Sequence, residues 1–399
     1  MARLKPLCES ASYKVVLTMK IILTTTRAWY LGNTALALSH RNSLLFLLMA
    51  DKKPSLLPPQ LYRRCWPYHV AMKFFYHCTS QILEEKATYF FSYLFDSWLE
   101  KELRRHSYDV IHAIMGFGIH GFRHASSKNA LKVVDCPNTH PVTLRGFWQR
   151  ECDLWCPGEN VPIPGRFFRR MTQELEMADL ILCPSVFVKE TMLLNGIPES
   201  KCFVNPFGVD SQLFKSRSLI PTAPKFICVG TICVRKGYQY LFRAFELVKK
   251  VIPNAELICV GDYKRDFAKE KPKWNGLFTH IPHVDHPTLA NMLQKCTAFV
   301  FPSQEEGFAR VISEAMGAGL PIIASYESGA TTLVRDGVEG FIVRGRDPHH
   351  IAEAMIRVAL DSELNLKMGH AAFEKGAAKN SWQDYGDRLL DAFAQKLSC

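Results

Sequence analysis

The chain has 399 residues, 48% of them hydrophobic and 22% charged, and carries a formal net charge of +11. This length predicts two domains rather than one core. No run approaches the roughly 18 apolar residues that cross a bilayer, and no apolar signal-peptide core follows the first residues. We therefore expect neither a membrane-spanning helix nor a secreted protein.

The excess positive charge is concentrated at the start of the chain. Residues 1–105 hold 15 of the basic and 7 of the acidic side chains, with aromatic residues among them, as in Tyr62-Arg63-Arg64 and in 74–76. A basic, aromatic surface suits an anionic membrane leaflet or a phosphorylated acceptor. The alternative is a merely basic protein with aromatic core residues. We expect no nucleic-acid binding, because no helix-turn-helix, finger or RNA-binding signature is present.

Thirteen cysteines are scattered along the chain, and some, such as Cys183, lie inside apolar runs. The closest pairs are Cys152/Cys156 and Cys228/Cys233. Neither pair has a second pair at the spacing of a zinc site. We therefore expect reduced thiols, no cysteine-bound metal and a cytoplasmic protein.

Strand-like and helix-like runs alternate along the chain. The predicted strands are 15–23, 110–113, 131–135, 180–184, 225–229, 256–260, 298–302, 321–324 and 340–343, and the clearest helices are 238–251, 311–318 and 382–397. This alternation predicts an α/β fold of two Rossmann-like units with parallel sheets. A polar, proline-containing stretch at 216–224 favours three parts: a first unit over 1–210, a second over 211–379, and a helix in 380–399 that packs back on the first unit.

The segment 225–237 combines a strand, a glycine at Gly230 and two cations, Arg235 and Lys236, ahead of a helix. A strand-to-helix turn of this kind presents backbone N–H groups and a helix N-terminus to an anion. The two cations would add charge-assisted contacts to a diphosphate. The alternative is a solvated Arg-Lys pair on the surface, with no ligand.

A second segment, 299–321, holds two carboxylates eight residues apart, Glu306 on a loop and Glu314 on a short helix. Both can face one cleft at the carboxyl edge of the sheet, where ligands of such folds bind. A carboxylate can accept two hydrogen bonds from the vicinal hydroxyls of a sugar. The alternative for Glu314 is an exposed helix residue. We expect the neighbouring Glu305 at the surface.

This segment resembles the Glu-x7-Glu signature of the family-4 (group 1) retaining glycosyltransferases, with Glu306 and Glu314 as its acids. The Arg-Lys-Gly turn resembles the same family's phosphate-binding turn, and the blocks at 328–330 and 336–341 resemble the block that follows. Together they cover residues 225–345. The resemblance implies the GT-B architecture, in which two Rossmann-like domains face each other across a cleft.

By this resemblance Glu314 would hold the ribose hydroxyls of a nucleotide, and Glu306 would contact the donor sugar. Arg235 and Lys236 would hold the diphosphate. The other donor-binding residues would be Gly307, Phe308, Ala309, Gly230 and Gly32. The last of these follows the first strand, in a loop with one glycine where the family's loop is rich in glycine.

The first half of the chain resembles the family less closely, mainly at 178–188 and 205–210. His140 follows a predicted strand at the place where such enzymes often have a histidine in the cleft. It would contact the donor sugar or orient the acceptor, and His112 and His120 compete for this role. The alternative for His140 is a structural group. The insert at 54–105 has no family counterpart.

The implied reaction moves a sugar from a nucleotide-diphosphate sugar to a hydroxyl of a saccharide or lipid-linked acceptor, with retention at the anomeric carbon. Polysaccharide, lipopolysaccharide and glycolipid synthesis are all compatible, with peripheral contact to the inner face of the membrane. The catalytic group would be Glu306, His140, Arg235 and Lys236. No Asp-x-Asp occurs, so we expect no metal and no cofactor beyond the co-substrate.

We favour front-face displacement, in which the leaving phosphate helps to deprotonate the acceptor, over double displacement by two carboxylates. Two alternatives remain open. One is an epimerase or phosphorylase of the same fold, and the other is a catalytically degenerate partner subunit.

Overall fold

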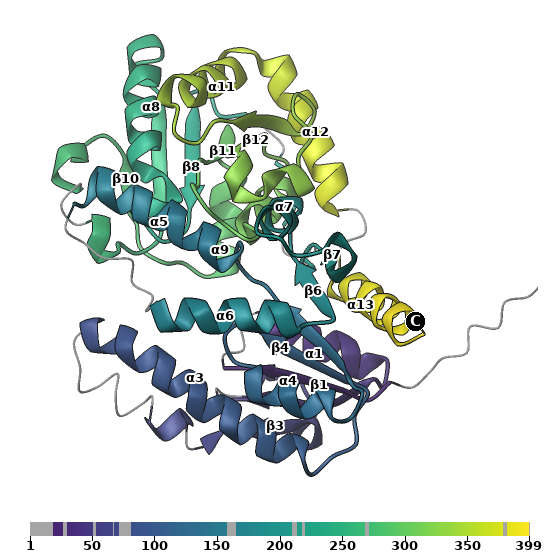
Figure 1. The fold of residues 1–399 in the computed structure, drawn as a ribbon. Helices are drawn as coiled ribbons and strands as arrows, with labels where there is room; N and C mark the ends of the chain where they lie inside the picture. Colours follow the sequence, from purple (N-terminus) through teal and green to yellow (C-terminus); the bar gives the residue numbers. More distant parts are fainter. Residues whose placement is uncertain are drawn as a thin grey trace, which may run out of the picture.

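The computed structural model describes residues 19–26, 30–50, 53–66, 68–71, 81–157, 165–209, 214–217, 220–267, 271–377 and 381–398. The predicted strand residues 15–18 and the aromatic residues 74–76 lie outside these ranges. The described residues form two α/β units, one above the other in Figure 1.

The first unit is built on a seven-stranded parallel sheet in the order β3-β2-β1-β4-β5-β6-β7. Its strands are β1 (Ile21–Thr25), β2 (Leu44–Met49), β3 (Tyr62–Arg64), β4 (Val110–Ile114), β5 (Leu131–Asp135), β6 (Leu180–Cys183) and β7 (Cys202–Val204). Its helices are α1 (Leu31–His40), α3 (Gln81–Leu103), α4 (Ile119–Ser126), α5 (Pro141–Trp155), α6 (Gly165–Met177) and α7 (Val186–Leu194).

The second unit is built on a six-stranded parallel sheet in the order β10-β9-β8-β11-β12-β13. Its strands are β8 (Lys225–Val229), β9 (Glu256–Val260), β10 (Thr279–Ile281), β11 (Ala298–Phe301), β12 (Ile322–Ser325) and β13 (Gly340–Val343). The helices that follow are α8 (Tyr238–Val251), α9 (His286–Leu293), α10 (Arg310–Gly317), α11 (Pro348–Leu360), α12 (Ser362–Ala377) and α13 (Trp382–Leu397).

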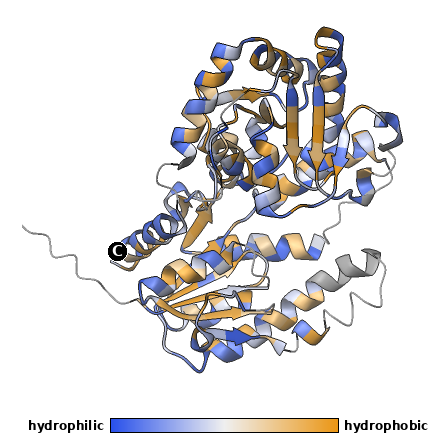
Figure 2. Ribbon diagram, turned by 180° about the vertical axis from the view of Figure 1, so that it is seen from behind, coloured by the Kyte–Doolittle hydropathy of each residue, from blue (hydrophilic) through white to orange (hydrophobic). Residues whose placement is uncertain are grey.

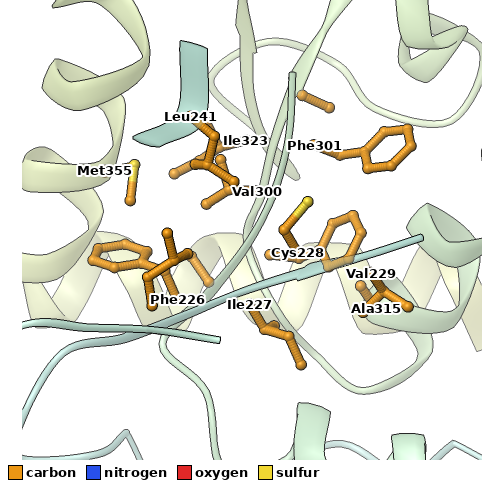
Figure 3. Packing of buried hydrophobic residues seen from close by; sticks show 14 of the residues in the cluster. Phe226, Ile227, Cys228, Val229, Leu241, Val300, Phe301, Ala315, Ile323 and Met355 are labelled. Carbon is orange, nitrogen blue, oxygen red and sulfur yellow. The ribbon is translucent and has the colours of Figure 1, made fainter. Parts of the chain in front are cut away.

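Most strands are continuous apolar runs because helices cover both faces of each sheet, whereas the edge strands β3 and β10 carry polar residues. Figure 2 shows the strands mostly in the hydrophobic colour. In the second unit, side chains from β8, β11 and β12 pack against α8, α10 and α11, as Figure 3 shows for Phe226, Val300, Ile323, Leu241, Ala315 and Met355. This core fixes the strand ends from which the site loops emerge.

Each sheet reverses its strand order once, between β1 and β4 in the first unit and between β8 and β11 in the second. Loops at the carboxyl ends of these strands diverge to opposite faces, which leaves a crevice for a ligand. The segments 230–237 and 302–309 emerge at this point in the second unit. The two regions that the sequence singles out are therefore neighbours in space.

Two helices bind the units together. Helix α5 belongs to the first half of the chain, yet its Cys152 and the following C-cap residue, Cys156, are part of the hydrophobic core of the second unit. Helix α13 follows the second unit and packs on α1, with Tyr385 and Phe393 in the core of the first. A Cβ on Gly208 would lie 2.6 Å from the Cα of Trp382, so the two chain crossings run side by side.

The strands β5, β8, β9 and β13 coincide with the predictions at 131–135, 225–229, 256–260 and 340–343. The three-residue strands β3, β7 and β10 lie at sheet edges and were not predicted. Within the described part of the chain, no helix is both long and apolar enough to span a bilayer. The ten cysteines described there are all free thiols.

Candidate active site

The segment after β5 and the segment after β11 touch where the two units meet. A Cβ on Gly307 would collide with the carbonyl oxygen of Pro137. Two residues along, Thr139 donates to Oε1 of Glu305 from its backbone N–H at 3.2 Å and from its Oγ1 at 2.9 Å. Glycine at 307 is therefore required by close approach between the units.

The expectation that Glu305 lies at the surface is wrong, because the residue is fully buried. Its Oε2 accepts from Nη1 of Arg235 at 2.8 Å, and its carbonyl oxygen accepts from the same nitrogen at 2.6 Å. A buried carboxylate needs partners of this kind. Glu305 positions the first cation of the basic turn.

The basic turn itself is a short 3-10 helix, Val234–Lys236, that ends at Gly237 with φ +75°. A Cβ at Gly237 would collide with the carbonyl oxygen of Pro302, so the turn fits closely against the loop after β11. Lys236 forms an ion pair with Glu306 and lies 5.1 Å above the centre of the Phe301 ring. The two predicted cations and the first acid therefore belong to one cluster.

The two cations of this cluster, Arg235 and Lys236, repel each other. Burial, and then the neighbouring charge of Arg235, lower the pKa of Lys236 to about 7. The guanidinium carbon of Arg235 lies 5.7 Å from the centre of the Trp148 ring on α5, which covers this side of the turn. Two partly buried cations share the carboxylates of Glu305 and Glu306. An anionic ligand here would relieve the repulsion between the cations.

Glu314 lines a cavity of about 180 Å³ between the units. The other lining residues are Asn33, Gly208, Val209, Phe214, His286, Arg310 and Trp382. The side chain of Glu314 is 8% exposed and lies 3.6 Å from Nδ1 of His286. Burial raises the pKa of Glu314, while His286 and Arg310 oppose this shift. Glu306 does not line this cavity, so Glu306 and Glu314 would contact different parts of a ligand.

The backbone between the two acids has free donors. Among the described residues, no acceptor binds the backbone N–H groups of Gly307, Phe308 or Ala309. Ala309 is the N-cap of α10, whose first turn faces this stretch. Unsatisfied N–H groups at a helix N-terminus are a ready anion site. The Phe308 ring instead packs on Phe207, at 5.4 Å between ring centres.

The two remaining glycines differ in what they offer. The N–H of Gly230 donates to the Val260 carbonyl at 2.8 Å, and its carbonyl accepts from Tyr238, so its backbone groups are engaged within the second unit. Gly32 is buried in the first turn of α1, beside the cavity-lining Asn33.

The three candidate histidines lie in different places. His140 is the N-cap of α5, where its Nδ1 accepts from the Val142 N–H at 3.3 Å, and burial lowers its pKa to about 4. His112 is buried on β4 with its Nε2 3.0 Å from Asp135. The Nδ1 of His120, on α4, lies 3.7 Å from Oε2 of Glu100 on α3.

Buried charges also shape the loop after β4. Glu174 accepts from the N–H groups of Gly116 and Gly118, the latter at 2.8 Å, and Arg170 donates to the Gly116 carbonyl at 2.7 Å. Arg170 also pairs with Asp96. Burial raises the pKa of Glu174 to about 7, against the effect of Arg170. This loop lies at the strand-order reversal of the first unit.

Sequence reasoning missed Thr139, Trp148, Asn33, His286 and Arg310, all of which lie beside the predicted groups. Arg310 could have been found from the helical spacing, since it is one turn before Glu314. The others come from distant segments, and no local pattern marks them.

The chain is similar to known glycosyltransferases along most of its length. Residues 210–375 match the family described as glycosyl transferases group 1, and residues 64–213 match Glycosyltransferase Family 4. D-inositol 3-phosphate glycosyltransferase 1 of Catenulispora acidiphila is 38% identical over 269 residues, which cover 60% of this chain and 63% of that protein. Poly(glycerol-phosphate) alpha-glucosyltransferase of Bacillus subtilis is 26% identical over 243 residues, or 59% and 35% of the two chains. The chain thus matches less than two thirds of the length of these relatives.

Solved structures with the same fold cover nearly the whole chain. Sucrose-phosphate synthase from Thermosynechococcus elongatus has a TM-score of 0.71 at 18% identity, covering 95% of this chain and 99% of that one. Anabaena HepE in complex with UDP-glucose has a TM-score of 0.67 at 15% identity, covering 94% and 100%. The two family matches together extend from residue 64 to residue 375, and the chain belongs to the family-4, group 1 glycosyltransferases and has their GT-B fold.

Proposed function

We propose that the protein transfers a sugar from a nucleotide-diphosphate sugar to a hydroxyl acceptor, with retention at the anomeric carbon. The observation that carries this proposal is the junction of three groups at one strand-order reversal. The cavity around Glu314 would take the nucleoside. The Arg235–Lys236 turn and the free N–H groups of Gly307 to Ala309 would take the diphosphate, and Glu306 would contact the sugar.

The chemistry follows from where charge develops. As the anomeric bond breaks, negative charge collects on the departing diphosphate and positive charge on the sugar. Arg235, Lys236 and the amides before α10 stabilise the negative charge on the diphosphate. The carboxylate of Glu306 stabilises the positive charge on the sugar. We propose front-face attack, in which the leaving phosphate accepts the proton of the acceptor hydroxyl, and a metal-independent reaction.

The names of the relatives suggest an acceptor class. One relative is named for inositol 3-phosphate, one for poly(glycerol-phosphate) and one for capsular polysaccharide biosynthesis. We propose that the acceptor here is likewise a polyol or saccharide hydroxyl, in polysaccharide, lipopolysaccharide or glycolipid assembly. The cleft between the units is where such a hydroxyl would meet the donor.

A thermal-shift screen against UDP-, GDP- and ADP-sugars tests the donor assignment, because a ligand that binds only the folded state raises its stability. Glu314→Ala should lose the shift, whereas Glu353→Gln, an exposed acid on α11, should keep it. NMR of the product with the active donor then gives the anomeric configuration. An inverted linkage would refute retention, and equal shifts in both variants would refute the role of Glu314.

We also propose peripheral contact of the first unit with anionic membrane. Trp66 and Phe90 are 59% and 57% exposed, and the Arg64 guanidinium lies 4.5 Å above the Trp66 ring. Aromatic and basic side chains together suit the headgroup region of an anionic leaflet. Co-sedimentation should favour phosphatidylglycerol vesicles over phosphatidylcholine vesicles, and Trp66→Ser should weaken it. Equal sedimentation with both vesicle types would count against this contact.

A further inference from the structure

Helices α5 and α6 enclose a groove that the proposed function leaves unused. Its volume is about 660 Å³, which lies within the range that small-molecule ligands fill. Helix α5 contributes Val142, Arg145 and Gly146 to its wall, and α6 contributes Phe168 and Arg169. The groove lies outside the cavity around Glu314, with which it shares no lining residue.

One side of the groove is apolar. The Val142 side chain is 60% exposed, and the Phe168 ring forms the floor beside it. Gly146 leaves the groove open, because an added Cβ there would meet no atom of the described residues within 4 Å. A helix usually disfavours glycine in its interior. Packing against the described residues therefore does not require glycine at 146.

The other side of the groove is positive. Its charged lining residues are Arg145, Arg169 and Glu176, so cations are in excess. The Arg145 guanidinium lies 5.8 Å from the centre of the Phe168 ring. Within the described part of the chain, neither arginine forms an ion pair with a carboxylate. Two arginines without acidic partners beside an apolar floor suit an anion that carries an apolar portion.

The groove opens beside the candidate active site. Its first lining residue, Pro141, follows His140 at the N-cap of α5. The next residue back is Thr139, which is bonded to Glu305 at the meeting point of the two units. Of the groove's lining residues, Pro141 is therefore the one nearest along the chain to the contact between Thr139 and Glu305.

We propose that this groove binds an anionic, amphiphilic part of the acceptor, with a phosphate at Arg145 and Arg169 and an apolar segment along Val142 and Phe168. This proposal rests on the proposed function, because it names the chemistry of the acceptor in the same transfer reaction. It assigns the first unit a selectivity for acceptors that carry both a phosphate and an apolar portion.

The test is calorimetric titration of the whole chain with octyl phosphate below its micelle concentration. Octyl glucoside supplies the tail without the charge, and inorganic phosphate supplies the charge without the tail. Octyl phosphate should bind at least tenfold more tightly than either. Arg145→Gln and Arg169→Gln should each weaken it about tenfold, and Gly146→Trp should abolish binding by filling the groove.

Two controls accompany these variants. Arg150→Gln removes an exposed arginine of α5 outside the groove and should leave binding unchanged. Gly146→Leu replaces the tryptophan variant if that variant unfolds at a lower temperature. Equal binding of octyl glucoside, or octyl phosphate binding unaffected by Gly146→Trp, would overturn the proposal. The proposal would also be overturned if Gly146→Trp lost binding to phosphatidylglycerol vesicles but kept binding to octyl phosphate.

The thermal shift given by nucleotide sugars separates this proposal from the proposed function. The Gly146→Trp variant should still show the thermal shift with nucleotide sugars, but it should no longer bind octyl phosphate. If none of the nucleotide sugars raises the unfolding temperature of the unaltered chain, the proposed function fails. If a nucleotide sugar raises the unfolding temperature but the groove substitutions leave the affinity for octyl phosphate unchanged, the groove proposal alone fails.

Discussion

Thr139 and Glu305 join the two units directly, through two hydrogen bonds from Thr139 to one carboxylate oxygen. The other oxygen of Glu305 holds Arg235. A single buried acid therefore connects the segment that leads to His140 with the turn assigned to the diphosphate. The relative position of the units and the geometry of the basic turn cannot change independently.

We expect Glu305→Ala to be among the most damaging substitutions in the cleft. It leaves the partly buried Arg235 guanidinium and the Thr139 donors without their acceptor, and breaking a buried ion pair costs up to about 3–5 kcal/mol. Chemical denaturation measures this loss. Thr139→Val, which removes only the Oγ1 contact, should cost about 1 kcal/mol. Equal losses in the two variants would contradict the central role of the carboxylate.

Lys236 should make donor binding depend on pH. Its pKa in the folded chain is lowered to about 7, so the unfolded chain binds more protons between pH 7 and the ordinary lysine value. This group alone therefore makes stability rise with pH across that window. A bound diphosphate favours the protonated amine, so binding should take up a proton above pH 7.

Calorimetry in two buffers of different ionisation enthalpy counts that proton. Lys236→Gln should abolish the uptake and weaken nucleotide-sugar binding. Lys250→Gln, an exposed lysine at the end of α8, should change neither. Proton uptake that persists in Lys236→Gln would assign the effect to another group.

His140 can be tested by a substitution that keeps its structural role. Asparagine is a favoured N-cap residue, so His140→Asn should leave the unfolding midpoint nearly unchanged. Transfer should still fall about 100-fold if the imidazole acts on the substrate. Because burial lowers the pKa of His140 to about 4, activity between pH 6 and 8 should not follow its titration. A fully active His140→Asn would leave only the capping role.

Glu174 should contribute an opposite pH dependence. Its folded pKa is raised to about 7, so the folded chain binds more protons than the unfolded chain between about pH 4.5 and 7. Stability from this group is therefore present at the acid end and is lost as pH rises through 7, by roughly 3 kcal/mol. Glu174→Gln should flatten that part of the stability profile. Glu176→Gln, an exposed acid on the same helix, should not.

The sequence was most informative where function requires a local pattern. Glu306, Glu314 and the Arg235–Lys236 turn stand out because glycines and a strand–loop–helix change surround them. Glu305 was misplaced, since its burial depends on Thr139, which is distant in sequence. The edge strands β3, β7 and β10 were missed because three residues are too few to establish a period. The packing of α5 on the second unit also depends on tertiary contacts that sequence position does not indicate.

The side-by-side crossings at Gly208 and Trp382 have a mechanical consequence. A single connection would allow one unit to rotate freely against the other, whereas two adjacent connections restrict that rotation. Removal of α13 would leave a single connection between the units, and it would also take Trp382 from the cavity around Glu314 and Tyr385 and Phe393 from the core of the first unit.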